Sequence, residues 1–402
     1  MITLEDIQRA RSAVKGVAHN TALDYSQTFS DLSGNEVYLK LENMQKTGSF
    51  KVRGAYNKIV SLSEEERAKG VIAASAGNHA QGVAFASAKA NIPSTIVMPE
   101  GAPLAKLQAT KNYGAQIVLY GDTFDEALEY ASSLQRETGA TFVHAFDDEH
   151  IISGQGTIGL EIIEQLPDVE LIVCPIGGGG LISGIAKAVK ELKPSVYIYG
   201  VEAAACPSMV KSLQKHSPVK VATASTIADG IAVKRPGEIT FNMVQSYVDD
   251  IVTVDDLEIS RTMLYLLERG KQLVEGSGAV ALAALLFKKI PLAGKKAVAI
   301  VSGGNVDIHF LSRIIEHGLV EAGRFVKLST MVPDKPGHLN QLLGIIADQK
   351  ANIISVEHYR ISSRVIPGQT EIQLSLETRD RQHIEQIEHA LRQAGYRFTR
   401  KI

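Results

Sequence analysis

Several features that would direct the chain to particular classes of protein are scarce in its sequence. Only two of the 402 residues are cysteines, Cys174 and Cys206, and they have neither the spacing of metal ligands nor the pattern of a disulfide framework. A formal net charge of −2 gives no reason to expect nucleic acid or an anionic membrane as a partner. No apolar run approaches the length of a membrane span, and residues 1–7 mix charges without the apolar segment of a signal peptide. We therefore expect a cytoplasmic protein that binds neither nucleic acid nor membrane.

What is present is typical of a globular α/β protein. The hydrophobic content is 45% and the charged content 21%, and 402 residues are too many for one ordinary core, so two or three domains are expected. Short apolar runs at 71–74, 94–98 and 116–120 are each followed by a helical pattern, and a second such series runs from about 150 to 301. This alternation predicts βαβ units and a mostly parallel sheet.

The pattern changes near residue 324. Residues 326–332 alternate apolar and polar side chains, and a turn and a helix follow. Two more strands, a helix and a last strand are predicted at about 353–360, 370–377, 384–391 and 396–400. This βαββαβ order is that of a ferredoxin-like domain. We place the boundary at about 322–325, which gives a larger region at 1–322 and a C-terminal domain at 325–402.

Residues 46–55 contain the lysine on which the functional interpretation depends. Thr47 and Ser49 are helix-capping residue types, and apolar positions follow at near-helical spacing, which predicts Lys51 in the first turn of a helix. Burial there, and the positive end of the helix dipole, would disfavour the charged ammonium and make the amine a better nucleophile. A single lysine is more often a solvated surface residue, so the interpretation rests on the other motifs.

A glycine-rich segment lies directly between a predicted strand and a predicted helix. It consists of Gly177, Gly178, Gly179 and Gly180. Backbone N–H groups and the helix dipole at such a junction can hold a single compact phosphate. The segment matches neither the G-x-G-x-x-G fingerprint nor the P-loop. A tight turn without a ligand is the alternative.

Two further polar segments also follow predicted strands. The first is Ser75, Ala76, Gly77, Asn78 and His79, in which Ser75 is a candidate helix cap and the exposed amides could hold a carboxylate. An ordinary capped helix is the alternative, and His79 by itself fits a structural role better than that of a catalytic base. The second segment begins with Ser302. Because ligands of open α/β sheets bind at the carboxyl ends of strands, we expect these segments to meet.

The order of the four motifs resembles that of the fold-type II pyridoxal-phosphate enzymes, and within them the threonine dehydratases (threonine ammonia-lyases), over residues 1–322. The resemblance implies two parallel-sheet subdomains, the smaller at roughly 41–148 and inserted in the larger. The C-terminal domain resembles an ACT regulatory domain through the turn formed by Asp334, Lys335, Pro336, Gly337 and His338.

The resemblance also implies roles for single residues. Lys51 matches the lysine that binds the aldehyde of pyridoxal 5'-phosphate, and Phe50 matches the aromatic residue beside its ring. Asn78 matches the partner of the 3-hydroxyl oxygen and Ser302 the partner of the pyridine nitrogen. The phosphate cup corresponds to Gly177, Gly178, Gly179, Gly180 and Leu181, and the loop that grips the substrate carboxylate to Ser75, Ala76, Gly77, Asn78 and His79.

The implied reaction removes the β-hydroxyl of L-threonine, and also of L-serine, to give a 2-oxo acid and ammonia. A serine at the pyridine nitrogen favours elimination over transamination. Serine racemases are similar but carry a second serine where this chain has Ala76, so we expect little racemisation. Ser208 stands where the relatives' cation site has an aspartate, so we expect no divalent metal, and a monovalent ion near Glu202 stays open.

The ACT resemblance implies regulation by an amino acid such as isoleucine or valine, bound at residues 334–338 between paired modules. A purely dimerising module is the alternative. We expect a homodimer or homotetramer, and isoleucine biosynthesis as its pathway, with a catabolic role left open. Competing interpretations are a β-replacement enzyme with the same cofactor, a serine racemase or dehydratase, and an amino-acid-binding regulatory protein with an inactive catalytic lobe.

Overall fold

The computed structural model describes residues 2–222, 224–361 and 365–401. The chain divides into two compact units, Met1–Asp307 and Ile308–Ile402. Each unit has its own hydrophobic core. No helix in the described ranges has both the length and the apolar character needed to cross a bilayer.

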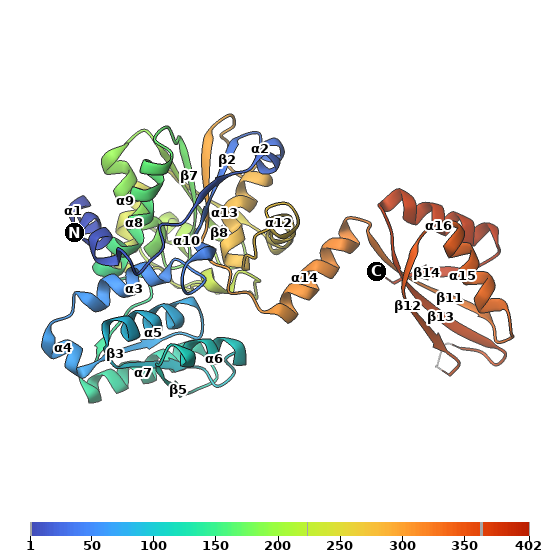
Figure 1. Ribbon diagram of the computed structural model, residues 1–402, viewed down its shortest axis with the longest axis horizontal. Coiled ribbons are helices and arrows are strands. Elements are labelled where there is room, and N and C mark those ends of the chain that lie inside the picture. The colour runs from blue at the N-terminus through green and yellow to red at the C-terminus, as the bar shows by residue number, and fades with distance from the viewer. Residues whose placement is uncertain (1, 223, 362–364, 402) are drawn as a thin grey trace. The chain divides into compact units, whose positions relative to one another are not determined.

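The first unit contains a six-stranded sheet, which includes β2, β7 and β8 (Figure 1). Its strand order is β1-β2-β10-β7-β8-β9. All neighbouring strands are parallel except β1, which is antiparallel to β2. Its strands are β1 Leu23–Tyr25, β2 Glu36–Leu41, β7 Leu171–Pro175, β8 Tyr197–Ala203, β9 Asp250–Val254 and β10 Lys296–Val301. Every residue of β7 is buried, as expected for a central parallel strand covered on both faces. The predicted parallel α/β architecture is thus confirmed, with one antiparallel edge strand that the sequence did not indicate.

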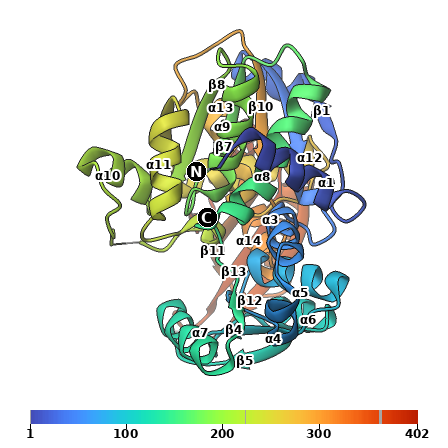
Figure 2. The same ribbon diagram turned by 90° about the vertical axis from the view of Figure 1, so that its left-hand side faces the viewer.

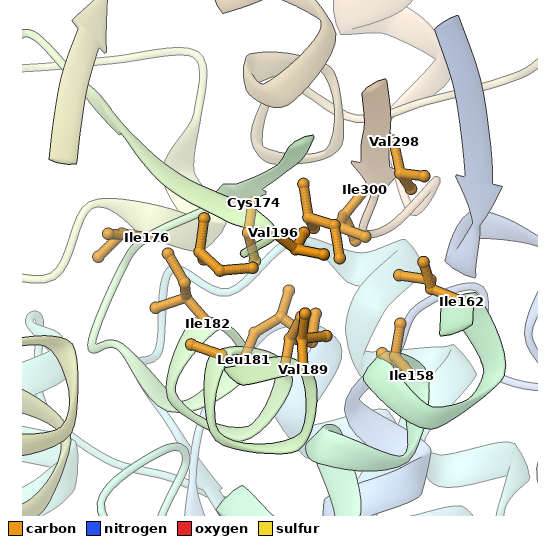
Figure 3. Packing of buried hydrophobic residues seen from close by; sticks show 14 of the residues in the cluster. Ile158, Ile162, Cys174, Ile176, Leu181, Ile182, Val189, Val196, Val298 and Ile300 are labelled. Carbon is orange, nitrogen blue, oxygen red and sulfur yellow. The ribbon is translucent and has the colours of Figure 1, made fainter. Parts of the chain in front are cut away.

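Helices cover both faces of this sheet. The helices of this part are α1 Leu4–Val14, α2 Gln27–Ser33, α8 Glu149–Gln165, α9 Gly180–Leu192, α10 Ser208–Lys215, α11 Glu238–Tyr247, α12 Asp256–Glu268 and α13 Gly276–Leu286, with short 3-10 turns at Glu42–Met44 and Asp229–Ile231. Helices α8, α9 and α11 share one core with β7 and β10, while α13 packs against β7, β8 and β10 from the other side. Figure 3 shows side chains of the first core pointing toward one another, among them Ile158, Ile182, Cys174 and Ile300.

A smaller parallel sheet lies between β2 and α8 in the chain. Its order is β5-β4-β3-β6. The elements are α3 Lys51–Val60, α4 Glu64–Lys69, β3 Val71–Ala74, α5 Asn78–Ala90, β4 Ser94–Met98, α6 Leu104–Asn112, β5 Gln116–Leu119, α7 Phe124–Thr138 and β6 Thr141–Phe142. In Figure 2 this subdomain, with α5, α6 and α7, lies below the larger sheet. These elements span residues 51–142.

The second unit has a four-stranded antiparallel sheet in the order β12-β13-β11-β14. Its elements are α14 Ile308–Glu321, β11 Phe325–Pro333, α15 His338–Asp348, β12 Asn352–Tyr359, β13 Gln369–Glu377, α16 Arg381–Gln393 and β14 Phe398–Arg400. From β11 onward this is the predicted βαββαβ order, with apolar residues of α15 and α16 packed on the sheet. Helix α14 belongs to this compact unit, whereas the sequence interpretation assigned its residues to the larger region.

Candidate active site

A cavity of about 750 Å³ lies in the first unit, where the carboxyl ends of β3 and β7 and the residue after β10 meet. The four motifs found in the sequence all contribute to its lining. The lining residues among them are Phe50, Lys51, Ser75, Ala76, Gly77, Asn78, His79, Gly177, Gly178, Gly179, Gly180, Leu181 and Ser302. Segments as much as about 250 residues apart in the chain therefore converge, as the rule for strand ends predicts.

Lys51 is the first residue of α3, as expected, and its half-buried side chain lines the cavity. The Nζ atom donates a hydrogen bond to the carbonyl oxygen of Ala145 at 2.7 Å and lies 5.2 Å from the centre of the Phe50 ring. Burial lowers the pKa of this amine from 10.5 to about 8, although the nearby Glu275 carboxylate opposes the shift. With this pKa about a tenth of the amine is neutral at pH 7, far more than for an ordinary lysine, so Lys51 is a competent nucleophile and base.

The expectation that Thr47 or Ser49 caps α3 is wrong. The helix begins after Phe50 without a side-chain cap, and the hydroxyls of Thr47 and Ser49 are buried with no partner among the described residues. The reason is a tertiary contact. Ser49 pairs with Gly303 as an isolated antiparallel bridge, and the Phe50 N–H donates to the carbonyl of Ser302 at 3.1 Å. This pairing, rather than a local cap, fixes the start of α3 against the end of β10.

The glycine-rich segment forms a narrow cradle at the N-terminus of α9. A Cβ on Gly178 would lie 2.3 Å from the Phe146 ring, and one on Gly180 would lie 2.8 Å from the Phe146 carbonyl oxygen. Gly179 has a φ of +95°, which favours glycine. Thr240 Oγ1 holds the loop through a bond to the Gly178 carbonyl at 2.6 Å. A cradle that excludes side chains at the start of a 13-residue helix fits a phosphate group.

Asn78 is held from both ends of its amide. Its Nδ2 donates to Glu275 Oε1 at 2.6 Å, and its Oδ1 accepts from Asn305 Nδ2 at 2.8 Å.

Ser75 does not cap α5, because Gly77 is the N-cap residue and Ser75 Oγ instead accepts the Gly77 N–H at 3.1 Å. The cap prediction for Ser75 is therefore wrong, and the hydroxyl shapes the loop that precedes the helix.

His79 is buried, and its ring is held in the neutral form by its surroundings. Its Nε2 lies 2.8 Å from the carbonyl oxygen of Val143, so this nitrogen carries the hydrogen. Burial, with a smaller effect of the Lys51 charge, lowers the pKa of His79 to about 3. A neutral ring bonded to a backbone carbonyl supports the structural interpretation of this residue.

Ser302 follows β10 and is buried, with its hydroxyl 3.4 Å from the carbonyl oxygen of Ser277, to which it donates. The Ser277 hydroxyl lines the same cavity and has no partner among the described residues. Sequence reasoning missed Ser277 and its neighbour Glu275. Burial raises the pKa of the Glu275 carboxyl to about 7. The available signal was a lone acidic residue before Gly-Ser-Gly at the start of an apolar helix.

The carboxylate of Glu202, near which the sequence left a monovalent ion open, is hydrogen-bonded to backbone N–H groups. Its two oxygens accept the N–H groups of Met209 and Val210 at 2.8 and 2.9 Å, at the start of α10. Burial raises the pKa of this carboxyl to about 7. Within the described ranges, no three histidine, cysteine or acidic side chains gather as metal ligands.

Comparisons with known proteins agree with these features. Residues 14–303 match the family described as pyridoxal-phosphate dependent enzyme, and residues 324–395 match the ACT domain. The chain is 54% identical over 396 residues to an L-threonine ammonia-lyase of Thermotoga maritima, covering 98% of both proteins. A solved threonine deaminase isoform 2 from Solanum lycopersicum, in processed form, is 41% identical with a TM-score of 0.74, over 78% of this chain and 91% of that one. Maize serine racemase is 36% identical with a TM-score of 0.75, over 80% of this chain and 98% of its own.

Proposed function

The chain belongs to the pyridoxal-phosphate dependent enzymes, and we propose that it is an L-threonine ammonia-lyase. It converts L-threonine to 2-oxobutanoate and ammonia by eliminating the β-hydroxyl, and it also acts on L-serine. The observation that carries the proposal is the convergence of Lys51, the glycine cradle, Asn78 and Ser302 in one cavity. The 54% identity to an L-threonine ammonia-lyase over 98% of both proteins supports the choice of reaction. The family match confirms the cofactor expected from the sequence.

The residues of the cavity fit this cofactor. We assign the phosphate to the cradle formed by Gly177, Gly178, Gly179, Gly180 and Leu181, the aldehyde carbon to the Lys51 amine, and the ring to the space beside Phe50. Asn78 would meet the 3-oxygen of the ring, and the Ser302 hydroxyl its nitrogen. When bound, pyridoxal phosphate would make the α-proton of an attached amino acid acidic, and the electron pair left by that proton would expel the β-hydroxyl.

The protein contributes position and proton transfer. The Lys51 amine, with its lowered pKa, accepts the Cα proton. Residues 75–79 present backbone N–H groups at the start of α5, where a substrate carboxylate is favoured. The neutral Ser302 hydroxyl does not hold a proton on the ring nitrogen as a carboxylate would, and this favours loss of the hydroxyl over transamination.

Serine racemisation is the second candidate, because maize serine racemase is similar over 80% of this chain. Ala76 decides against it. Its methyl group lines the cavity in the loop before Asn78 and cannot take or give a proton on the second face of the substrate. We expect L-serine to yield pyruvate and ammonia. Formation of D-serine at a rate comparable to elimination would contradict this assignment.

We also propose that the ACT domain makes the enzyme responsive to isoleucine or valine. The turn 334–338 supports this, because Gly337, with a φ of +95°, is the N-cap residue of α15 and Arg360 Nε donates to Asp334 Oδ1 at 3.2 Å near that helix N-terminus. Assembly as a homodimer or homotetramer in the cytoplasm belongs to the same proposal. A flat response of activity to both amino acids over a wide concentration range would contradict the regulatory part.

The reaction is tested by absorbance and product formation. Purified protein should show the absorbance band of the lysine-bound cofactor and should form 2-oxobutanoate from L-threonine. Lys51→Ala should lose both, whereas Lys46→Ala, at an exposed position of the preceding loop, should keep both. A band without 2-oxobutanoate would point to β-replacement, and absence of the band in the unmodified protein would refute the proposed function altogether.

A further inference from the structure

A chain of hydrogen bonds determines which end of the Asn78 amide faces which neighbour. It begins at the backbone carbonyl oxygen of Thr47, which can only accept a hydrogen bond. Asn305 Nδ2 lies 2.8 Å from this oxygen. Asn305 Nδ2 is therefore a donor, and its second hydrogen goes to Asn78 Oδ1 at 2.8 Å. At the other end, Asn78 Nδ2 donates to Glu275 Oε1 at 2.6 Å. A flipped Asn78 amide would face a donor with a donor and an acceptor with an acceptor.

The surroundings keep the two outer members of this chain in place. Glu275 is buried just before α13, and the Asn305 backbone also hydrogen-bonds its carboxylate. A Cβ on Gly303 would lie 2.5 Å from Glu275 Oε1, so the loop after β10 closes tightly over the carboxylate. A Cβ on Gly48 would lie 2.3 Å from Asn305 Oδ1. Two glycines thus make room for the side chains that flank Asn78.

We propose that Glu275 and Asn305 are positioning residues that hold the Asn78 amide with its nitrogen toward the cofactor ring. One hydrogen of Nδ2 is used by Glu275 and the other is left for the 3-oxygen of the ring. Because the amide oxygen is occupied by Asn305, the ring oxygen meets a donor and is kept unprotonated. The inference rests on the proposed assignment of Asn78 to this oxygen and adds the two residues that enforce its orientation.

The test uses the absorbance spectrum of the full-length holoenzyme and the dissociation constant of pyridoxal 5'-phosphate by equilibrium dialysis. Glu275→Ala and Asn305→Ala should change the ratio of the bands with protonated and unprotonated ring oxygen at least twofold. Each should weaken cofactor binding by about tenfold, the loss expected for one hydrogen bond to a charged group. Glu275→Gln retains an acceptor oxygen and should stay within about twofold of the unmodified protein in both measurements.

A double variant separates positioning from general destabilisation. If Glu275 acts through Asn78, Asn78→Ala/Glu275→Ala should bind the cofactor as weakly as Asn78→Ala alone, within about twofold. Glu65→Ala is the control, because Glu65 is exposed, pairs with Lys69 at 2.6 Å and lies outside the residues that line the cavity. This control should leave the band ratio unchanged, and circular dichroism and melting temperature verify that each variant is folded.

Three results would overturn the inference. They are an unchanged band ratio in folded Glu275→Ala, additive losses in the double variant, and a Glu275→Gln variant that keeps the spectrum but loses more than tenfold in kcat. The last result would make the carboxyl a proton carrier instead of a positioning group. In all three cases the unmodified protein still shows the lysine-bound band and forms 2-oxobutanoate, so the failure is distinguishable from failure of the proposed function.

Discussion

Replacing Lys51 with methionine should stabilise the cofactor-free protein at neutral pH. The amine has a pKa of about 8 in the folded protein against an ordinary 10.5, and this difference corresponds to about 3 kcal/mol. Because the lysine side chain is partly open to a cavity that water can enter, we expect a gain of about 1.5 to 3 kcal/mol in the free energy of unfolding at pH 7. Methionine has a similar length and carries no charge.

The pH dependence gives this prediction its sign. Between pH 8 and 10.5 the unfolded lysine binds more protons than the folded one, so the unmodified protein regains stability as the pH rises through this interval. The advantage of Lys51→Met is therefore full below pH 8 and should fall below about 1 kcal/mol at pH 10.

Urea denaturation of the cofactor-free proteins measures the effect. The transition of the first unit must be followed separately, because the two units of the chain can unfold independently. Lys46→Met, at an exposed position, is the control and should change stability by less than about 0.5 kcal/mol. A Lys51→Met protein that is less stable than the unmodified one at pH 7, or a gain that persists at pH 10, would refute the reasoning.

Three further predictions are measured by urea denaturation or by equilibrium dialysis of pyridoxal 5'-phosphate. Arg53→Met should lose about 3–5 kcal/mol in urea denaturation, because Glu42 would stay buried without its ion-pair partner and Glu161 would keep only Lys40. Arg9→Met, at an exposed position, should lose little, and equal losses would contradict this prediction. Gly178→Ala should weaken binding of pyridoxal 5'-phosphate at least about tenfold, because the added Cβ would collide with the Phe146 ring. Gly344→Ala is the control, because the space around Gly344 is open, and it should not change the affinity. Unchanged affinity in Gly178→Ala would contradict the assignment of the phosphate to the glycine cradle. Glu275→Gln should stabilise the cofactor-free protein at pH 8 and progressively less toward pH 4.5. The reason is that the folded carboxyl has a raised pKa of about 7, so that above this pH it is held in its unfavourable charged form. A gain in stability that grows on acidification would refute this prediction.

The sequence was informative where a local pattern and a general rule agree. Strand ends followed by polar or glycine residues predicted that residues 75–79, 177–180 and 302 would meet, and they line one cavity. Helical spacing placed Lys51 in the first turn of α3. These predictions succeed because parallel strands share one carboxyl edge and because the apolar period fixes the face of a helix.

Features that depend on distant contacts were missed or misread. Thr47 and Ser49 have the chemistry of caps, yet Ser49 pairs with Gly303, which no local window contains. Glu275 has no motif of its own, and its importance follows only from its contact with Asn78, nearly two hundred positions earlier. Strand β1 spans three residues, too few for an alternating pattern to reveal it.

The polar groups on the two sides of helix α3 differ in how many of them have hydrogen-bond partners, and this difference has a functional consequence. Two residues beyond Lys51, the Arg53 guanidinium donates to both Glu42 and Glu161, to Thr157 and to the carbonyl of His19, so its donors are well used. Lys40 adds a further bond to Glu161 in the same buried network. This network ties α3 to β2 and α8 behind the cavity.

On the cavity side, by contrast, the matching is incomplete. The Lys51 amine has one hydrogen bond, and the hydroxyl of Ser277, another residue that lines the cavity, has none among the described residues. Unmatched buried polar groups destabilise the folded chain, and they persist where a ligand can use them. Substitutions that make the cavity apolar should therefore raise stability and abolish function, whereas substitutions in the Arg53 network should lower stability first. Cofactor binding should correspondingly stabilise the first unit, and it should do so far less in Lys51→Met, which lacks the amine that joins the cofactor to α3.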